Sequence, residues 1–456
     1  MAPDGSKSDV KAIVVGYAAE LGFDLVRVAS AEDFTEDRTV ALARLRAGLM
    51  SGLPWYTEAR VRRGTSPQEL LPGARSIICL GVNYYQPAGP APPPGNATGK
   101  VAMYARGRDY HKPMKGRMRA YVEGLRALLD STFEARWYVD DGPMLDRAAS
   151  RRAGLGWTGK NTNLLTPGLG SWVFLGQVVT NLALDADLPL RKSCGACVRC
   201  IDACPTGAIV AQYTVDNARC ISYLTIENWG PVPAELRPQM QDWVFGCDIC
   251  QEICPVNRKA LSSGSGSWGK EPAPSMPGAL PQECPSKERS DEESGAGSLH
   301  GSLDPPPQTS RFTRGNIFQG IFEARPTQGG QGEVSTRHGL EFLDLVGLLE
   351  MSEEEFRHRF RGTPVLRAKR AGLQRNACVA LGNRRDPATV AALRRALLNG
   401  ETLVRGHAAW ALGRIGTVEA QQAIDQARVE ETDQQVLEEI ADALEAQNHP
   451  PGVKPA

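Results

Sequence analysis

The sequence predicts an α+β protein in three parts: an α/β domain, a cysteine-rich domain and a domain of helical repeats. Three observations support this prediction. Helical and strand-like patterns alternate through residues 1–190, eight cysteines crowd between Cys194 and Cys254, and two related helical motifs begin 31 residues apart, at Asn376 and His407. A chain of 456 residues also exceeds the size at which a single hydrophobic core usually stops growing, so several folded units are expected.

Residues 1–190 show the helix and strand patterns of an α/β domain. Apolar residues between Val10 and Leu21 recur at helical spacing, and Gly22 stands where a C-cap glycine would end the helix. Short apolar runs predict strands at Ser76–Val82, Arg136–Val139 and Ser171–Val179. Between the first two strands, a second helix is indicated by the spacing of Met114, Met118, Tyr121, Val122, Leu125 and Leu129.

The cysteines of residues 191–261 follow the spacing of bacterial ferredoxins. The first run, C-x2-C-x2-C-x3-C-P from Cys194, is that spacing in full, and a second run, C-x2-C-x3-C-P, begins at Cys247. Cys220 lies between the two runs. Eight thiolates in this order predict a ferredoxin-like domain with two [4Fe–4S] clusters. Zinc is the alternative, because CxxC pairs also form tetrahedral zinc sites, but the unbroken first run favours iron–sulfur.

The ligands of each cluster follow from the rule that the cysteine before proline binds the other cluster. The first cluster is then expected on Cys194, Cys197, Cys200 and Cys254. The second is expected on Cys204, Cys247 and Cys250, with Cys220 as the remaining nearby candidate for the fourth ligand. Three other cysteines stand alone in the sequence and are predicted to be free thiols: Cys79, Cys284 and Cys378.

Bulk properties argue against several classes of protein. The 52 basic and 52 acidic residues balance, so no global charge steers the chain toward nucleic acid or membrane. No apolar run approaches the ~20 residues of a bilayer span, and the N-terminus lacks a charged stretch followed by an apolar core. We therefore expect a cytoplasmic monomer without membrane contact, in which cysteines serve metal binding rather than disulfides.

The C-terminal part divides into a linker and a repeat region. Residues 262–310 are rich in Ser, Gly and Pro, which predicts a disordered linker or insertion. In residues 311–456, NACVALGNRRDP from Asn376 aligns with HAAWALGRIGTV from His407, and VLEEIADALEA from Val436 repeats the pattern more loosely. HEAT-like helix pairs fit this spacing, and a small helical bundle is the alternative.

Two literal motif matches in the N-terminal part fail on their context. The segment G-L-G-W-T-G from Gly154 matches the dinucleotide fingerprint, but a helix predicted from Pro143 precedes it and extended chain follows, which reverses the required order. We therefore expect no NAD site. Asp109-Tyr-His111 begins the D-x-H-x-x-G signature of some cobalamin proteins, yet Met114 replaces its glycine, so His111 is expected to be solvated or hydrogen-bonded.

Two acidic residues follow a predicted strand in the segment VDDGP. Asp141 stands directly before Gly-Pro and suits the N-cap of the helix predicted from Pro143. Asp140, one residue earlier, can point from the strand end into a cavity, where functional carboxylates occur. On the residues alone, a capping or surface role is the alternative for Asp140.

These motifs together resemble the epoxyqueuosine reductase family. The resemblance rests on ELLPGARSII (69–78), YARGRDYHK (104–112), VDDGP (139–143), AGLGWTGKN (153–161), CGACVRCIDACPTGAI (194–209), RCISYLTIE (219–227) and FGCDICQEICPVN (245–257), and on the HEAT-like tail. It covers nearly the whole chain except the segment from Ser262 to Ser310, where this sequence departs from the family's more direct passage into the repeats.

The resemblance implies the last step of queuosine synthesis, in which the epoxide of epoxyqueuosine at the tRNA wobble position is reduced and water leaves. Base-off cobalamin would be the reactive centre of residues 1–190, and two [4Fe–4S] clusters would relay electrons from an external donor. Two rivals are a reductive dehalogenase and a plain electron carrier. The helical repeats and the missing twin-arginine signal count against the first, and the large N-terminal domain counts against the second.

The resemblance also implies site residues. Asp140 occupies the place of the family's proton donor, and cobalamin contacts map to Arg63, Ala102, Asp140, Leu164, Leu175 and Ser222. The stretch from Arg357 is locally basic through Arg359, Arg361, Arg367, Lys369, Arg370, Arg375, Arg384 and Arg385. Such a patch fits phosphate contacts to tRNA carrying epoxyqueuosine, for which Arg367, Lys369 and Arg370 are the candidates. A solvated helical face is the alternative.

Overall fold

A four-stranded antiparallel sheet forms the centre of the N-terminal part of the computed structural model, which describes residues 7–93, 95–261 and 340–448. The strand order is β1 (Leu25–Ser30), β2 (Ser76–Asn83), β7 (Val173–Thr180) and β4 (Ala135–Tyr138). Every residue of β2 is buried, which explains its continuous apolar run. The three predicted strands are confirmed to within two residues at each end, whereas β1 was not predicted.

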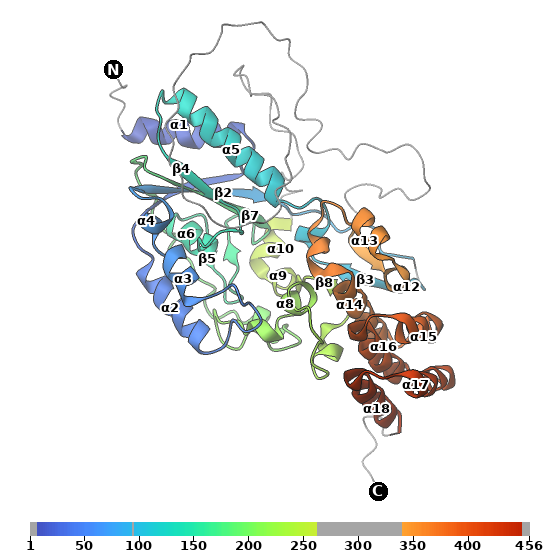
Figure 1. Cartoon of the computed structure of the whole chain (residues 1–456). Helices are drawn as coiled ribbons and strands as arrows, with labels where there is room; N and C mark the ends of the chain where they lie inside the picture. The colour runs from blue at the N-terminus through green and yellow to red at the C-terminus, as the bar shows by residue number, and fades with distance from the viewer. Residues whose placement is uncertain (1–6, 94, 262–339, 449–456) are drawn as a thin grey trace, which may run out of the picture. The chain divides into compact units, whose positions relative to one another are not determined.

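Helices cover both faces of this sheet (Figure 1). One face carries α1 (Lys7–Glu20) and α5 (His111–Leu128), and Val14, Met118 and Tyr121 belong to the buried cluster on that side. The other face carries α2 (Thr35–Arg46), α3 (Glu58–Gly64), α4 (Pro67–Leu70) and α6 (Asp146–Arg152). Gly22, with φ at 77°, ends α1 as predicted.

The cysteine-rich part consists of short helices joined by turns. They are α7 (Arg199–Asp202), η2 (Asn217–Arg219), α8 (Ile221–Ile226), η3 (Arg237–Met240), α9 (Ile249–Glu252) and α10 (Pro255–Leu261). A small antiparallel pair, β5 (Trp157–Thr158) and β6 (Leu164–Leu165), precedes them in the chain. Because β5 follows α6, the glycine-rich segment from Gly154 lies after a helix and before extended chain, which is the order predicted for it.

A second sheet joins segments that are far apart in the sequence. β3 (Thr98–Val101), which is followed by η1 (Met103–Ala105), pairs in parallel with β8 (Trp243–Phe245) and antiparallel with β9 (Phe342–Asp344). Close by in the chain, the guanidinium of Arg106 pairs with the carboxylate of Glu341 at 2.9 Å, and both side chains are 9% exposed. The N-terminal, cysteine-rich and C-terminal segments therefore share one sheet.

The C-terminal part stacks its helices in two rows (Figure 1). One row contains α14 (Lys369–Arg384), α16 (Thr402–Ile415) and α18 (Gln434–Asn448), and the other contains α15 (Val390–Asn399) and α17 (Val418–Glu430). Short elements precede or connect them: α12 (Leu345–Glu350), α13 (Glu353–Arg359), η4 (Pro364–Ala368) and η5 (Pro387–Thr389).

Two glycines occupy equivalent positions one repeat period of 31 residues apart. A Cβ at Gly382 would lie 2.9 Å from the Cα of Ala411, and a Cβ at Gly413 would lie 2.8 Å from the Cβ of Ala443. Gly382 on α14 and Gly413 on α16 are one period apart, so each allows a close approach of its helix to the next helix of the row. The predicted period is thus the step from one helix of the row to the next.

The helix predicted from Pro143 is wrong at its start, because α6 begins at Asp146. Packing from α3 explains the difference. A Cβ at Gly64 would come within 1.7 Å of the carbonyl oxygen of Pro143, so this segment lies against α3 and not in a helical turn. The predicted capping role of Asp141 is also wrong, since α6 has no side-chain cap.

Three further expectations concern single segments. The predicted linker at residues 262–310 lies outside the described residues, as does Cys284. Cys79 and Cys378 are buried free thiols, as predicted. Among the helices that the structure describes, none combines the length and the apolar character needed to cross a bilayer.

Candidate active site

Asp140 lies just after β4, and a tyrosine from another element holds its carboxylate. The hydroxyl of Tyr110, directly before α5, donates a hydrogen bond to Oδ2 of Asp140 at 2.8 Å. The ring of Tyr110 stacks on those of His111 and Phe174, each at a centroid distance of 4.2 Å. Nδ1 of His111 in turn lies 2.6 Å from Oδ1 of Asp109, so His111 is hydrogen-bonded. Asp140 itself is exposed, so a buried, stacked tyrosine presents an accessible carboxylate.

The backbone at Asp140 is left-handed, with φ at 58°, a conformation that aspartate tolerates better than most residues. The next residue stabilises the turn. Oδ1 of Asp141 accepts a hydrogen bond from the backbone N–H of Val139 at 3.2 Å, and Oδ2 accepts one from Lys115. Burial alone would raise the pKa of Asp141, but these bonds hold its pKa below the usual range. Asp141 is thus a charged anchor for the turn that carries Asp140.

Asp146, at the start of α6, is a titratable group that the sequence analysis did not single out. Its Oδ1 is buried and has no hydrogen-bond partner among the described residues, and the same holds for Oε1 of Gln177 on β7. Nε2 of Gln177 donates to Oγ of Ser150 at 3.3 Å and to the carbonyl oxygen of Asp146 at 3.4 Å. Burial, and after it the negative charge of Asp140, raises the pKa of Asp146 to about 8. Asp146 is therefore mostly protonated at neutral pH.

The two cysteine runs hold seven cysteines and Cys220 lies between them, so the predicted crossed ligation divides eight thiols into two groups of four. In the first group, burial and then the charges of nearby thiols raise the pKa of Cys200, and those thiols are Cys194, Cys254 and Cys197. In the second group, burial raises the pKa of Cys220, whose neighbouring thiols are Cys204, Cys247 and Cys250. These neighbours agree with crossed ligation, and the thiol of Cys200 also acts on Cys250, so the two expected groups lie near each other. The ligation itself stays a prediction.

The glycine-rich segment ends in three residues that hold the cysteine loops. Nζ of Lys160 donates to the carbonyl oxygen of Gly195 at 2.7 Å, and Nδ2 of Asn161 donates to that of Cys250 at 3.0 Å. Nδ2 of Asn163 lies 3.9 Å from Sγ of Cys250. Lys160 and Asn161 are buried, so their polar groups depend on these partners. The chain after β5 therefore fixes one loop of each cysteine run.

The donor chemistry of this region fits two iron–sulfur clusters. All eight cysteines are half-buried and unpaired with one another as disulfides. The thiolates of a [4Fe–4S] cluster each bind a different iron atom, and four cysteines are available in each group. In the part of the chain that the structure describes, no three His, Cys, Asp or Glu side chains gather around one point as a single ion would need.

The residues suggested as cobalamin contacts lie in several elements. Ala102 follows β3 and shares a buried apolar cluster with Ile221 and Leu224 of α8, the helix that carries Ser222. Leu164 on β6 is buried, and Leu175 on β7 packs against the same cluster as Leu164. Arg63 on α3 is exposed. Small and apolar side chains of this kind suit the edge of a large organic ring, and their contact with cobalamin stays a prediction.

The basic stretch from Arg357 to Arg385 is only partly a charged surface. Arg375 is fully buried, contrary to the predicted patch, because its guanidinium donates to three backbone carbonyls of the cysteine-rich part. Arg367 pairs with Glu227, and Arg370 pairs with Glu353 and Glu401. Nζ of Lys369 lies 3.7 Å from the ring centroid of Trp229. The three proposed phosphate contacts therefore already have partners.

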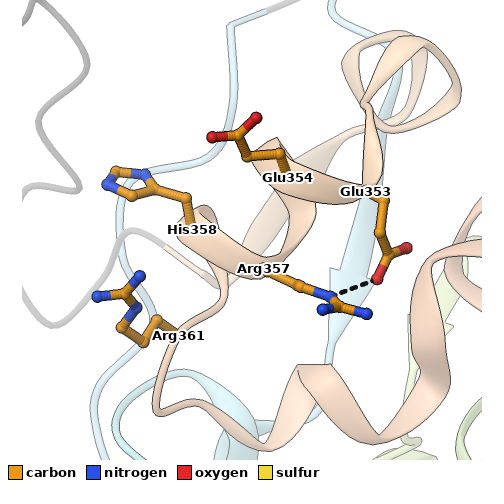
Figure 2. A pocket seen from close by; sticks show the side chains of 5 residues that line it. All are labelled: Glu353, Glu354, Arg357, His358 and Arg361. Carbon is orange, nitrogen blue, oxygen red and sulfur yellow. Dashed lines mark hydrogen bonds and ion pairs between the residues drawn. The ribbon is translucent and has the colours of Figure 1, made fainter.

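A surface hollow of about 510 Å³ lies along α13 and Arg361, two residues after it (Figure 2). Its lining residues are Glu353, Glu354, Arg357, His358 and Arg361. Arg357 turns toward Glu353 and pairs with it at 2.7 Å, whereas His358 and Arg361 extend to the other side in this view. The hollow contains none of the residues proposed for catalysis or cofactor binding, so it is separate from the candidate active site.

Comparison with known proteins adds three family models. Residues 193–257 match a 4Fe-4S double cluster binding domain, residues 64–141 match "Epoxyqueuosine reductase QueG, DUF1730", and residues 363–445 match HEAT repeats. The double-cluster and HEAT matches confirm the predicted α+β organisation and favour HEAT repeats over a small helical bundle.

Individual relatives cover most of the sequence. An epoxyqueuosine reductase from Xanthomonas campestris is 32% identical over 413 residues, which are 90% of this chain and 97% of the relative. One from Synechocystis is 47% identical over 193 residues, which are 42% of this chain and 66% of the relative. A crystal structure of an epoxyqueuosine reductase with an epoxyqueuosine-modified tRNA-Tyr stem loop is 25% identical, with a TM-score of 0.76, and covers 97% of this chain and 100% of that one.

Proposed function

The chain belongs to the epoxyqueuosine reductase family, and we propose that it reduces the epoxide of epoxyqueuosine at the tRNA wobble position to queuosine. Members of this family are oxidoreductases. In the proposed reaction two electrons and two protons enter, both carbon–oxygen bonds of the epoxide break, a double bond forms between its two carbons, and one water leaves. The proposed substrate rests on the similarity to the solved family member with its modified tRNA stem loop.

Two [4Fe–4S] clusters are the proposed route for electrons. The two groups of four cysteines support this route, with Cys194, Cys197, Cys200 and Cys254 for one cluster and Cys204, Cys220, Cys247 and Cys250 for the other. Because iron binds thiolates, cluster binding is coupled to the release of thiol protons. The proposal includes an external electron donor, which would supply electrons one at a time.

Cobalamin is the proposed reactive cofactor, and when bound it supplies redox chemistry at a carbon–oxygen bond. Ala102, Leu164, Leu175 and Ser222 would line its site, with Arg63 at the edge. Asp140 would hold the proton that goes to the departing oxygen. The hydrogen bond from Tyr110 and the anchor at Asp141 support that role, because they orient an exposed carboxyl group that a substrate can reach.

The proposal is tested with anaerobically purified full-length protein, loaded with cobalamin and with iron and sulfide. A stem loop carrying epoxyqueuosine is added with a strong reductant, and the nucleosides are analysed by mass spectrometry. We expect queuosine to appear, at a mass lower by one oxygen, and to require cobalamin. Protein that holds both kinds of cofactor and leaves the epoxide intact would overturn the proposal, and turnover of an organohalide by that same protein would point to a dehalogenase.

A further inference from the structure

Trp229 is an exposed aromatic side chain on a rigid loop between α8 and η3. Its side chain is 55% exposed, and it belongs to none of the hydrophobic clusters of the described residues. Burying a tryptophan stabilises a fold, but an exposed one contributes little to folding. The ring is therefore available for a ligand.

A buried arginine fixes the backbone on both sides of this ring. Nη1 of Arg375 donates to the carbonyl oxygens of Asn228 at 2.7 Å and Gly230 at 2.6 Å, and Nη2 donates to that of Leu224 at 2.7 Å. The side chain of Asn228 adds a bond from the N–H of Gly230 at 3.1 Å. Since Arg375 is fully buried in α14, the repeat region fixes the backbone of the loop that carries the ring.

One cationic side chain lies over the ring, and a second pairs with a nearby residue of the same segment. Nζ of Lys369 lies 3.7 Å from the ring centroid, and the guanidinium of Arg367, which is half-exposed, pairs with Glu227 two residues before Trp229. Lys369 has φ at 60° and ψ at 162°, a backbone region that is almost restricted to glycine. A lysine held in this conformation, with its ammonium over an exposed ring, is the kind of strained residue that occurs in ligand clamps.

A chain of contacts connects the loop of Trp229 to the candidate active site. The rings of Tyr104 and Tyr110 are 6.3 Å apart, and Tyr110 is the residue that binds Asp140. Tyr104 also packs against the buried cluster that contains Leu224 of α8, whose carbonyl oxygen accepts a hydrogen bond from Arg375. Tyr104 therefore connects the residue that binds Asp140 with the helix that leads into the loop of Trp229.

We propose that Trp229 is a stacking platform for an unpaired nucleobase of the RNA substrate, next to the nucleotide that carries the epoxide, with Lys369 and Arg367 placed for the phosphate between them. The inference rests on the proposed function and adds to it a base-stacking subsite. Proteins recognise single-stranded RNA by splaying bases onto aromatic rings, and every base has a face that can stack. The cations beside the ring fit the phosphate that accompanies such a base.

The first test compares Trp229→Ala and Trp229→Phe in the cofactor-loaded full-length protein, with an epoxyqueuosine stem loop as the probe. From the usual strength of base–aromatic stacking, we expect Trp229→Ala to weaken binding by about 5- to 150-fold and to raise KM with little change in kcat. Trp229→Phe keeps a ring and should stay within about threefold of the wild type. Leu128→Ala, at a side chain that is also 55% exposed, is the matched control and should change nothing.

A second measurement identifies the stacked base. Stem loops with one abasic position each are bound to the wild type and to Trp229→Ala. Removing the base at one position near the modified nucleotide should weaken binding to the wild type. The same removal should not weaken binding to Trp229→Ala any further. If every abasic position affects both proteins equally, or if Trp229→Ala binds and turns over like the wild type, the platform does not exist. A wild type that reduces no epoxyqueuosine would instead defeat the proposed function, so the two failures are distinguishable.

Discussion

Two acidic residues, Asp140 and Asp146, follow β4 in the chain, and their different surroundings suit them to different roles. Asp140 is exposed and accepts a hydrogen bond from Tyr110. Asp146 has a buried oxygen without a partner among the described residues and a pKa raised to about 8, first by burial and then by Asp140. Such pairs, in which one acid is accessible and the other holds its proton, are typical of sites that move protons.

Replacing Asp140 by Asn should reduce turnover and leave the cofactors bound. The amide keeps the shape of the side chain but cannot give up a proton, and positioned acid catalysis is typically worth ~10²–10⁴ in rate. We expect turnover of the stem loop to fall by about that factor. The measurement is single-turnover formation of queuosine, with cobalt and iron content determined on the same samples.

Asp130→Asn is the control for Asp140→Asn, because Asp130 is also exposed and also has a positive φ, at 43°. It should turn over like the wild type. Wild-type turnover by cofactor-loaded Asp140→Asn would assign the proton to water or to another residue.

Replacing Asp146 by Asn should change how stability depends on pH. The pKa of Asp146 in the folded state, about 8, lies above the ordinary value of 3.8, so between these values the folded state holds a proton that the unfolded state has lost. The contribution of protonated Asp146 to the free energy of unfolding is fully present below about pH 4 and is lost as pH rises toward 8. Because asparagine does not titrate, Asp146→Asn should not lose stability in this pH range.

We therefore expect the melting temperature of Asp146→Asn to exceed that of the wild type by more at pH 8.5 than at pH 5. Other acidic groups near Asp146 are Asp140, whose charge acts on it, and the thiol of Cys79, while Arg147 opposes them. Asp425→Asn, at an exposed acid of α17, controls for a general charge effect. Parallel pH curves for the wild type and Asp146→Asn would contradict the assignment.

At the scale of elements, the segment between β4 and α6 shows what local sequence can and cannot predict. The strand before it and the helix after it follow from apolar patterns, and both exist. The start of the helix does not, because Arg60 of α3 donates to the carbonyl oxygen of Gly142 and Gly64 packs on Pro143. These partners lie about 80 positions earlier in the chain, and no local rule for helix starts contains them.

The predicted site residues differ from the missed ones in what the sequence shows of them. The cysteines stand in runs of fixed spacing, whereas Asp140 became a candidate through the family resemblance of VDDGP, since its residues alone also fit a capping or surface role. Asp146 has no such spacing, and its pKa depends on burial by other elements. Strand β3 has few apolar residues, and its partners β8 and β9 lie far along the chain, so neither length nor alternation marks it as a strand.

Cys220, between η2 and α8, is the cysteine whose assignment the spacing determines least. The charge of Cys204 acts on Cys220 and that of Cys220 acts on Cys247, which supports the prediction that Cys220 is the fourth ligand of the second cluster. Replacing Cys220 by Ala should therefore remove one cluster and spare the other. We expect iron to fall from about eight to about four atoms per chain, with the spectrum of one [4Fe–4S] cluster retained.

Cys378→Ala is the matched control, because Cys378 is a buried free cysteine of α14 and takes no part in either group. It should keep all its iron. Full iron content in Cys220→Ala would show that another residue completes the second cluster, and loss of both clusters would remove the support for separate groups.

At the scale of the whole molecule, the sheet β8-β3-β9 and the Arg106–Glu341 pair connect segments that the sequence presents as separate. Removing one member of a buried ion pair leaves the other without compensation, which usually costs about 3–5 kcal/mol. Glu341→Ala should therefore lower the free energy of unfolding by about that amount, measured by denaturant titration of the full-length protein.

Glu350→Ala provides the comparison, since Glu350 pairs with Arg395 and both side chains are about half exposed. Exposed pairs contribute about 0–1 kcal/mol, so this variant should unfold close to the wild type. Equal effects of the two substitutions would mean that the buried pair contributes no more than a surface pair, and the connection between the segments would then depend on the sheet.

The net charge of the chain is zero, so attraction of tRNA has to come from a local patch. Arg367, Lys369 and Arg370 are the proposed phosphate contacts, but in the absence of RNA Arg367 and Arg370 are paired with glutamates. Binding of RNA would exchange these pairs for phosphates. The gain in binding free energy per residue is consequently smaller for the paired arginines than for Lys369, whose ammonium lies over the ring of Trp229.

Replacing all three by Gln should weaken binding of the stem loop and flatten its salt dependence. Each lost contact to a single-stranded phosphate lowers the slope of log K against log salt by at most ~0.7, and the paired arginines should contribute less than that. The measurement is a series of binding titrations at increasing salt. The control replaces Arg394 and Arg395 of α15, which also have polar partners on the surface, and should keep the wild-type slope. An unchanged slope in the triple variant would identify the stretch as a solvated helical face. A flatter slope, with turnover retained at saturating RNA, would show that these cations contribute to RNA binding and not to the chemical step.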